Sequence, residues 1–149
     1  MNKLSHTAPA NWLQPEWPVS PRVHAFTTTR HNESNLETNL AHVLPEHCKP
    51  RYINQGHGAT VLKADDITTF IDADATWTCN ANVVCAIRTA DCLPVLLADA
   101  SGSVIAAVHA GWRGLAAGII SNSVAAIRPF IKSTLHAWVG PGISARTYE

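Results

Sequence analysis

The sequence lacks a surplus of either charge and lacks any long apolar run. Lysine and arginine together number 11, as do aspartate and glutamate, so the formal net charge of the 149 residues is zero. Proteins that bind a nucleic-acid backbone usually carry a basic patch, so we expect no nucleic-acid partner. Residues 1–7 lack the apolar core of a secretory signal, and no stretch approaches the roughly 20 apolar residues of a membrane span. We therefore expect a cytoplasmic protein with no membrane partner.

The cysteines and histidines form none of the short paired motifs that are typical of metal or redox sites. The four cysteines form no Cys-x-x-Cys pair, which argues against a zinc ribbon or a thioredoxin-like redox site and favours reduced thiols. The eight histidines include no His-x-His, the pattern in which copper ligands commonly occur in multicopper oxidases. Genuine multicopper chemistry is therefore disfavoured.

The remaining composition is that of a packed domain. Hydrophobic residues make up 46% of the chain and charged residues 15%, a balance typical of globular proteins, and the length suits a single domain over 1–149. Four prolines within residues 1–21 predict an irregular N-terminal arm. Residues 22–28 alternate between polar and apolar types and predict a strand, whereas the polar segment 30–39 predicts a loop.

The second half of the chain predicts a sheet with one helix. Apolar residues at helical spacing over 115–131 predict a single amphipathic helix, with Gly118 inside it allowing close packing. Strand, helix and strand over 104–139 predict a βαβ-like unit, whose ligands bind where strand ends meet loops. The short apolar runs that we expect to form strands are 60–63, 67–71, 83–88, 94–98, 104–108 and 135–139.

Three residues could form a metal site. Cys92 and His109 each stand at the exit of a predicted strand, and His57 lies in a loop between two glycines. A Cys/His/His set would leave one zinc position open, as catalysis requires. Separations of 35 and 17 residues carry no local signature, so spacing alone favours ordinary packing or hydrogen-bonding roles for these side chains. Cys92 and His109 also suit a thiol hydrolase, as nucleophile and base.

Other reactive residues flank these positions. Asp91 could act as a general base or hold a ligand histidine in one tautomer, although a turn aspartate is the simpler alternative. Gly111, Trp112 and Arg113 open the predicted helix, where an anion such as phosphate would bind. Trp112 could stack on a planar ring. Ordinary helix initiation and a core tryptophan are the corresponding alternatives.

Two strings carry a family resemblance. Thr-Ala-Asp-Cys-Leu-Pro-Val-Leu-Leu at 89–97 and Ala-Val-His-Ala-Gly-Trp-Arg-Gly-Leu at 107–115 resemble the YfiH-type family. This family is also called laccase-domain or polyphenol-oxidase-like, and its members are regarded as purine nucleoside phosphorylases. Weaker similarity lies at 54–58, 74–76 and 140–144. The resemblance implies an α+β fold of mixed β-sheets layered with helices, in α/β/β/α order, as one incomplete domain without the family's C-terminal segment.

The resemblance also implies a function. The family's zinc ligands correspond to His57, Cys92 and His109, and its activity is phosphorolysis of adenosine, inosine and methylthioadenosine together with deamination of adenosine. Purine nucleoside and phosphate are then the expected partners. Assembly of the chain into a homo-oligomer is a further possibility. On this interpretation Asp91, Cys92 and His109 are the catalytic candidates, and the substrate contacts come from Gly111, Trp112 and Arg113. Two alternatives remain: a Cys-His thiol hydrolase of the same fold, and an inactive fragment that acts as an interaction module.

Overall fold

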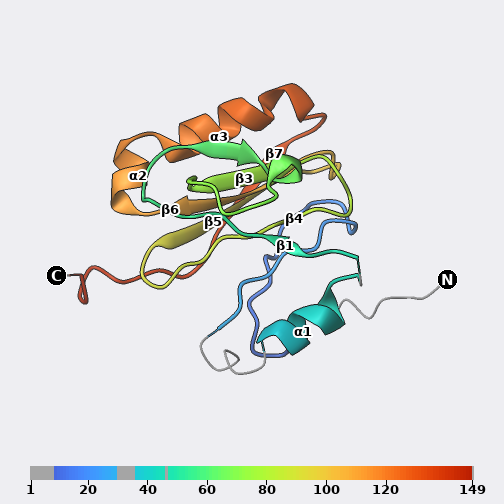
Figure 1. Ribbon diagram of the computed structural model, residues 1–149, viewed down its shortest axis with the longest axis horizontal. Helices are drawn as coiled ribbons and strands as arrows, with labels where there is room; N and C mark the ends of the chain where they lie inside the picture. The colour runs from blue at the N-terminus through green and yellow to red at the C-terminus, as the bar shows by residue number, and fades with distance from the viewer. Residues whose placement is uncertain (1–8, 30–35, 46, 149) are drawn as a thin grey trace.

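The computed structural model describes residues 9–29, 36–45 and 47–148, and its central feature is a five-stranded mixed sheet (Figure 1). In chain order the elements are α1 (Leu36–Val43), β1 (Pro50–Arg51), β2 (Val61–Lys63), the 3-10 turn η2 (Ala64–Asp66), β3 (Ala75–Thr78), β4 (Val84–Cys85), β5 (Leu93–Asp99), β6 (Ile105–Ala110), α2 (Trp112–Ala116), α3 (Ile119–Ile127), the 3-10 turn η3 (Arg128–Phe130) and β7 (Leu135–Val139).

The strand order of the large sheet is β2-β3-β6-β5-β7, while β1 and β4 form a separate parallel pair. β2 runs parallel to β3, and every other neighbour in the large sheet is antiparallel. Because β6 and β7 are both antiparallel to β5, they run parallel to each other with β5 between them. The βαβ-like unit predicted over 104–139 therefore exists, but its crossover skips one strand.

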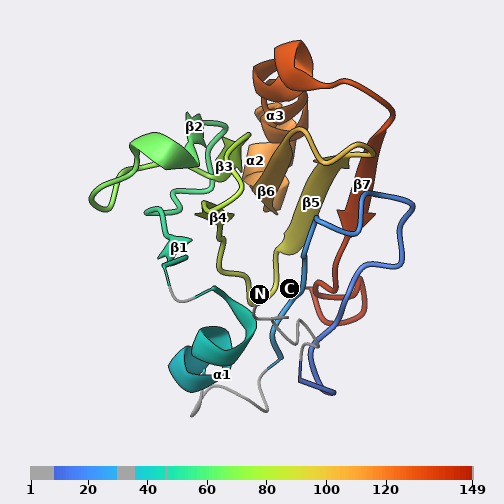
Figure 2. The ribbon, with the colours of Figure 1, turned by 90° about the vertical axis from the view of Figure 1, so that its right-hand side faces the viewer.

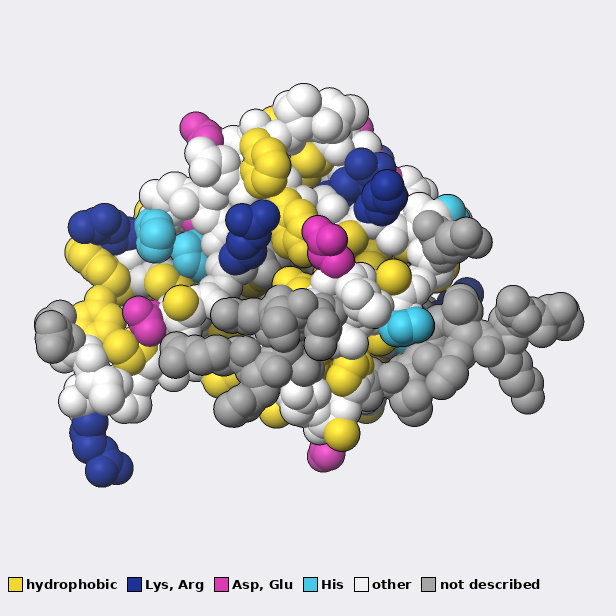
Figure 3. All heavy atoms as spheres, turned by 60° about the horizontal axis from the view of Figure 1, so that its bottom comes forward, with side chains coloured by type: hydrophobic (Ala, Val, Ile, Leu, Met, Phe, Trp, Pro, Cys, Tyr) yellow, Lys and Arg dark blue, Asp and Glu magenta, His cyan; other side chains and the backbone are white. Residues whose placement is uncertain are grey.

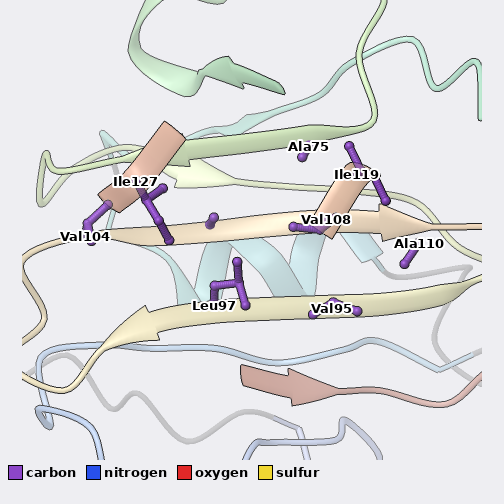
Figure 4. Close-up of a cluster of buried hydrophobic side chains, with 9 residues drawn as sticks. Ala75, Val95, Leu97, Val104, Val108, Ala110, Ile119 and Ile127 are labelled. Atoms are coloured by element: carbon purple, nitrogen blue, oxygen red, sulfur yellow. The ribbon is translucent and has the colours of Figure 1, made fainter. Parts of the chain in front are cut away.

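Burial explains why α2 and α3 lie on one face of this sheet. Figure 1 shows α2 and α3 on one side of the strands and α1 on the other, and Figure 2 shows β5 and β6 side by side between α3 and α1. Ile119 and Ile127 of α3 are fully buried and pack against Val104 and Val108 (Figure 4). Alternate β6 residues thus supply the core, and the intervening ones, including His109, point to the opposite face.

The prediction of one continuous helix over 115–131 is wrong, because two helices, α2 and α3, occupy this region. Gly118 has a φ of 88° and separates α2 from α3. A Cβ on Gly118 would meet nothing within 4 Å, so its role is not close packing. Glycine is required because the backbone enters the left-handed region, which side chains other than glycine rarely adopt.

Several strand predictions are corrected as well. Residues 22–28 make only a single bridge, between Leu13 and Thr27. Residues 67–71 follow the 3-10 turn η2 and form no strand, and Ile67 packs into a small cluster with Ile53 and Ala73. The run 83–88 contributes only the two residues of β4, while β3 was not predicted. Residues 60–63, 94–98, 104–108 and 135–139 match β2, β5, β6 and β7 to within two residues at either end.

The N-terminal part agrees with its prediction only in places. Residues 9–21 form no regular element and are held by Trp12, which is 5% exposed and packs on Phe26 with ring centroids 4.9 Å apart. Residues 36–39, predicted as loop, begin α1. Residues 1–8 and 30–35 lie outside the described part of the chain.

Two further features concern the surface charge and the length of the helices. On the face shown in Figure 3, lysine and arginine side chains are interspersed with acidic ones rather than gathered. Among the described helices, none has the length and apolar character needed to cross a membrane.

Candidate metal centre

Strand pairing brings Cys92 and His109 together. In the antiparallel register Leu93 faces Ala110 and Pro94 faces His109, so the start of β5 lies beside the end of β6. Cys92 directly precedes β5 rather than standing at the exit of a strand. His109 is only 3% exposed and, by the alternation along β6, lies on the face opposite to the core residue Val108. A separation of 17 residues in sequence thus becomes direct proximity.

A tethered loop delivers His57. The side chain of Gln55 donates to the carbonyl of Arg88 at 2.7 Å and accepts from its N–H at 2.7 Å, which ties this loop to the segment leading into β5. His57 itself adopts a φ of 61°. Its ring meets that of His109 edge-on, with centroids 4.8 Å apart. As predicted, the three segments converge: the donor atoms of His57, Cys92 and His109 all lie within 4.8 Å of one another.

A buried carboxylate that the sequence analysis did not assign to the site holds this arrangement. Asp74 is 2% exposed, and its Oδ1 lies 2.8 Å from Nδ1 of His109. Oδ1 also accepts from the N–H of His57 at 2.9 Å, and Oδ2 accepts from the N–H of Gly58 at 2.7 Å. Asp74 directly precedes β3, which pairs with the strand carrying His109. This position beside the partner strand is the signal that could have identified Asp74.

Two glycines permit close packing around the donors. A Cβ on Gly111 would lie 2.9 Å from Sγ of Cys92 and 3.2 Å from Cδ2 of His57. A Cβ on Gly114 would lie 2.7 Å from the carbonyl oxygen of Gly58. Only glycine at these positions lets α2 approach both the loop and the thiol, so Gly111 lines the donor cluster.

The remaining candidates lie at the rim. Asp91 is exposed, and among the described residues its carboxylate makes no hydrogen bond, while its carbonyl accepts from the N–H of Ile143 at 2.8 Å. The contact with His109, expected of a residue that orients a ligand histidine and predicted as one role for Asp91, is made by Asp74 instead. Trp112 is 61% exposed, so it is not a core residue, and the guanidinium of Arg113 lies 5.2 Å from the centre of its ring.

The donor set suits a zinc ion. Zinc bonds to nitrogen and sulfur of about 2.0–2.3 Å place the ligands of one ion within roughly 4 Å of each other, close to the spacing of His57, Cys92 and His109. Asp74 occupies Nδ1 of His109, which leaves Nε2 as the coordinating atom, and a carboxylate behind a ligand histidine is the usual arrangement in zinc proteins. Three protein donors would leave a position open for catalysis.

Comparison with known sequences identifies relatives. The family described as multi-copper polyphenol oxidoreductase laccase matches residues 25–149. The purine nucleoside phosphorylase PA4543 of Pseudomonas aeruginosa is 40% identical over 93% of this chain and 64% of its own length. The purine nucleoside phosphorylase YfiH of Escherichia coli is 34% identical over 92% of this chain and 65% of its own. The chain thus spans less than two thirds of the length of these relatives.

Solved structures agree on the fold. The Neisseria meningitidis protein NMB0706 superposes with a TM-score of 0.76 at 33% identity, covering 93% of this chain and 65% of the other. YlmD from Geobacillus stearothermophilus gives a TM-score of 0.65 at 28% identity, covering 80% and 50%. These similarities confirm the predicted mixed-sheet α+β fold, and the match spans 65% of the Neisseria chain. By sequence match and by structure, the chain belongs to the multi-copper polyphenol oxidoreductase laccase family, which includes the YfiH-type proteins.

Proposed function

We propose that this protein is a zinc-dependent purine nucleoside phosphorylase that also deaminates adenosine. The convergence of His57, Cys92 and His109 within 4.8 Å is the observation that carries the proposal. Relatives named purine nucleoside phosphorylases, 40% and 34% identical to this chain, supply the substrate class.

The residues at the donor cluster have different roles in this proposal. His57, Cys92 and His109 would hold the zinc ion, and Asp74 keeps the imidazole of His109 oriented. When bound, zinc supplies Lewis-acid activation of water, the chemistry that deamination at C6 of adenine needs. Cys92 is partly exposed, so the cluster is open to a substrate on that side.

The rim residues provide the substrate contacts in this proposal. The exposed indole of Trp112 offers a flat surface for a purine ring. Arg113 offers a bidentate donor for phosphate, and this charge carries the recognition because α2 has only five residues and therefore a small dipole. Asp91, next to Cys92, would assist proton transfer to the departing base when phosphate replaces it on the ribose.

The first test is the zinc content of the purified chain. Elemental mass spectrometry should give about one zinc per chain in the wild type and almost none in Cys92→Ala and His109→Ala. Zinc-loaded protein should then convert adenosine and phosphate into adenine and ribose 1-phosphate, with inosine as a second product. A wild type that binds no zinc, or loaded protein that forms none of these products, contradicts the proposal.

A second candidate is favoured by one contact. Cys92, His109 and Asp74 stand in the order of nucleophile, base and orienting carboxylate, with His109 and Asp74 2.8 Å apart, as in thiol hydrolases. His57 discriminates between the two functions, because a zinc centre needs it as a ligand and a thiol hydrolase does not. His57→Ala should abolish activity in the first case and leave most of it in the second.

Thiol alkylation separates the same two candidates. A metal-free hydrolase would lose activity as Cys92 reacts quickly with iodoacetamide near neutral pH. Cys85 serves as an internal control, because burial raises the pKa of its thiol to about 12 and keeps it unreactive. Rapid modification of Cys92 without zinc, with parallel loss of turnover, would replace the zinc proposal by the hydrolase.

A further inference from the structure

The carboxylate of Asp74 contacts two of the three donor-bearing segments at once. It lies 17 residues from His57 and 35 from His109 in sequence, yet it bonds to the backbone of one and to the ring of the other. With Gly58 included, three N–H groups point at one group that is 2% exposed. A carboxylate so enclosed is shielded from solvent, so these three N–H groups are its hydrogen-bond partners and each bond is stronger than it would be in water.

The first contact selects a tautomer. An ionised carboxylate only accepts hydrogen bonds, so Nδ1 of His109 must carry the hydrogen. In the neutral imidazole, Nε2 is then the nitrogen with a free lone pair. A metal ion can bind only to such a nitrogen, and a histidine without this partner would populate both tautomers. The contact therefore prepares His109 for coordination in advance.

The second pair of contacts stabilises an unfavourable backbone. His57 has a φ of 61°, in the left-handed region that costs free energy for a residue with a Cβ. The N–H groups of His57 and Gly58 follow one another and both point at Asp74, one to each oxygen. The carboxylate thus offsets the strain that brings the imidazole of His57 to the other donors.

We propose that Asp74 is the positioning residue of the metal centre, whose single carboxylate sets the tautomer of His109 and holds the loop of His57 before any ion binds. This inference rests on the zinc site of the proposed function. Asparagine cannot replace the group, since its amide presents one acceptor and one donor. Either the N–H of Gly58 or the pair formed by His57 and His109 would then face an N–H₂.

Asp99 provides a matched control. Its side chain is fully buried and accepts hydrogen bonds from the hydroxyls of Ser101 and Ser103 and from the N–H of Ser133 at 2.8 Å. None of these partners is a metal donor. Asp74→Asn and Asp99→Asn therefore remove equivalent buried carboxylates, and only the first touches the centre.

The tautomer of His109 is measured in metal-free protein by long-range proton–nitrogen correlation at pH 8. The wild type should show hydrogen on Nδ1 and a bare Nε2, whereas Asp74→Asn should show hydrogen on Nε2 in a substantial fraction of molecules. This wild-type measurement needs no variant to fold and no zinc to bind. Hydrogen found on Nε2 in the wild type, alone or together with Nδ1, overturns the proposal.

Zinc affinity is measured by competition with a chromophoric chelator. Removing a partner behind a ligand histidine typically weakens binding about 10–100-fold, and we expect a loss of that size for Asp74→Asn. Asp99→Asn should bind zinc within twofold of the wild type even though it unfolds more easily. Equal affinity in Asp74→Asn and the wild type, or an equal loss in both variants, overturns the positioning role. Absence of zinc from the wild type instead contradicts the proposed function, and the tautomer measurement then decides the role of Asp74 alone.

Discussion

Gly111 and Cys92 lie so close that a methyl group on the glycine would come within 2.9 Å of the cysteine sulfur. Contacts this short force something to move, and the thiol can move only by leaving its position among the donors. Gly111→Ala should therefore lower zinc affinity by about tenfold or more while the protein stays folded. Chelator competition and far-ultraviolet circular dichroism measure the two quantities.

Gly56→Ala is the control for this substitution. Gly56 lies in the same loop as His57, its φ is not positive, and a Cβ there would meet nothing within 4 Å. Its zinc affinity should equal that of the wild type. If Gly111→Ala bound zinc as tightly as Gly56→Ala, the close approach of Gly111 would have no bearing on the centre.

The tether between Gln55 and Arg88 should affect both stability and metal binding. Gln55→Ala removes both 2.7 Å hydrogen bonds to the backbone N–H and carbonyl of the exposed residue Arg88, a loss of about 1 kcal/mol in the free energy of unfolding. Because the loop of His57 would also be freed, zinc affinity should fall. Urea unfolding followed by tryptophan fluorescence gives the stability change.

Gln55→Glu makes this prediction sharper. Glutamate can still accept from the N–H of Arg88, but its second oxygen would face the carbonyl oxygen of Arg88 and repel it. We expect the glutamate variant to be destabilised as well, despite its similar size. Wild-type stability in both variants would mean that the tether contributes nothing.

Much of the sheet follows from local pattern, whereas the interruptions do not. The apolar runs of β5 and β6 predict buried strands because their residues pack on the core, as Val95, Leu97 and Val108 do, whereas β7 is an edge strand with no fully buried residue. The break at Gly118 was missed because apolar residues continue at helical spacing on both sides of it. Such a pattern records which residues are buried and says little about backbone dihedral angles.

The three side chains of the candidate site could be named from the sequence, but the contacts that organise them could not. Family strings identified His57, Cys92 and His109, and the structure places them together. Asp74 stands in a weak string and gains its role only through the register of β3 with β6. Pairings between distant strands leave no trace in local spacing, so Asp91, which neighbours Cys92 in sequence, was the candidate instead.

Asp99 should give the protein a specific sensitivity to acid. Burial raises the pKa of its carboxyl, but hydrogen bonds from Ser101, Ser103 and Ser133 outweigh this and hold the pKa well below its usual range. A depressed folded-state pKa stabilises the protein above the unfolded value of about 3.9, and this contribution is lost as pH falls below it. Asp99→Asn should thus be less stable than the wild type at pH 7, with a gap that narrows below about pH 4. Urea midpoints between pH 7 and pH 2 test this, and a gap that stays constant contradicts it.

Trp112 gives the substrate proposal a direct test. Its ring is 61% exposed, so Trp112→Ala should change the free energy of unfolding by less than about 0.5 kcal/mol. If the ring stacks on a purine, the same substitution should weaken adenosine binding several-fold, because the flat apolar surface is lost. Trp112→Phe keeps an aromatic ring and should retain most of the affinity. Equilibrium dialysis with labelled adenosine measures binding without requiring turnover, and equal affinity in the alanine variant and the wild type would remove Trp112 from the substrate site.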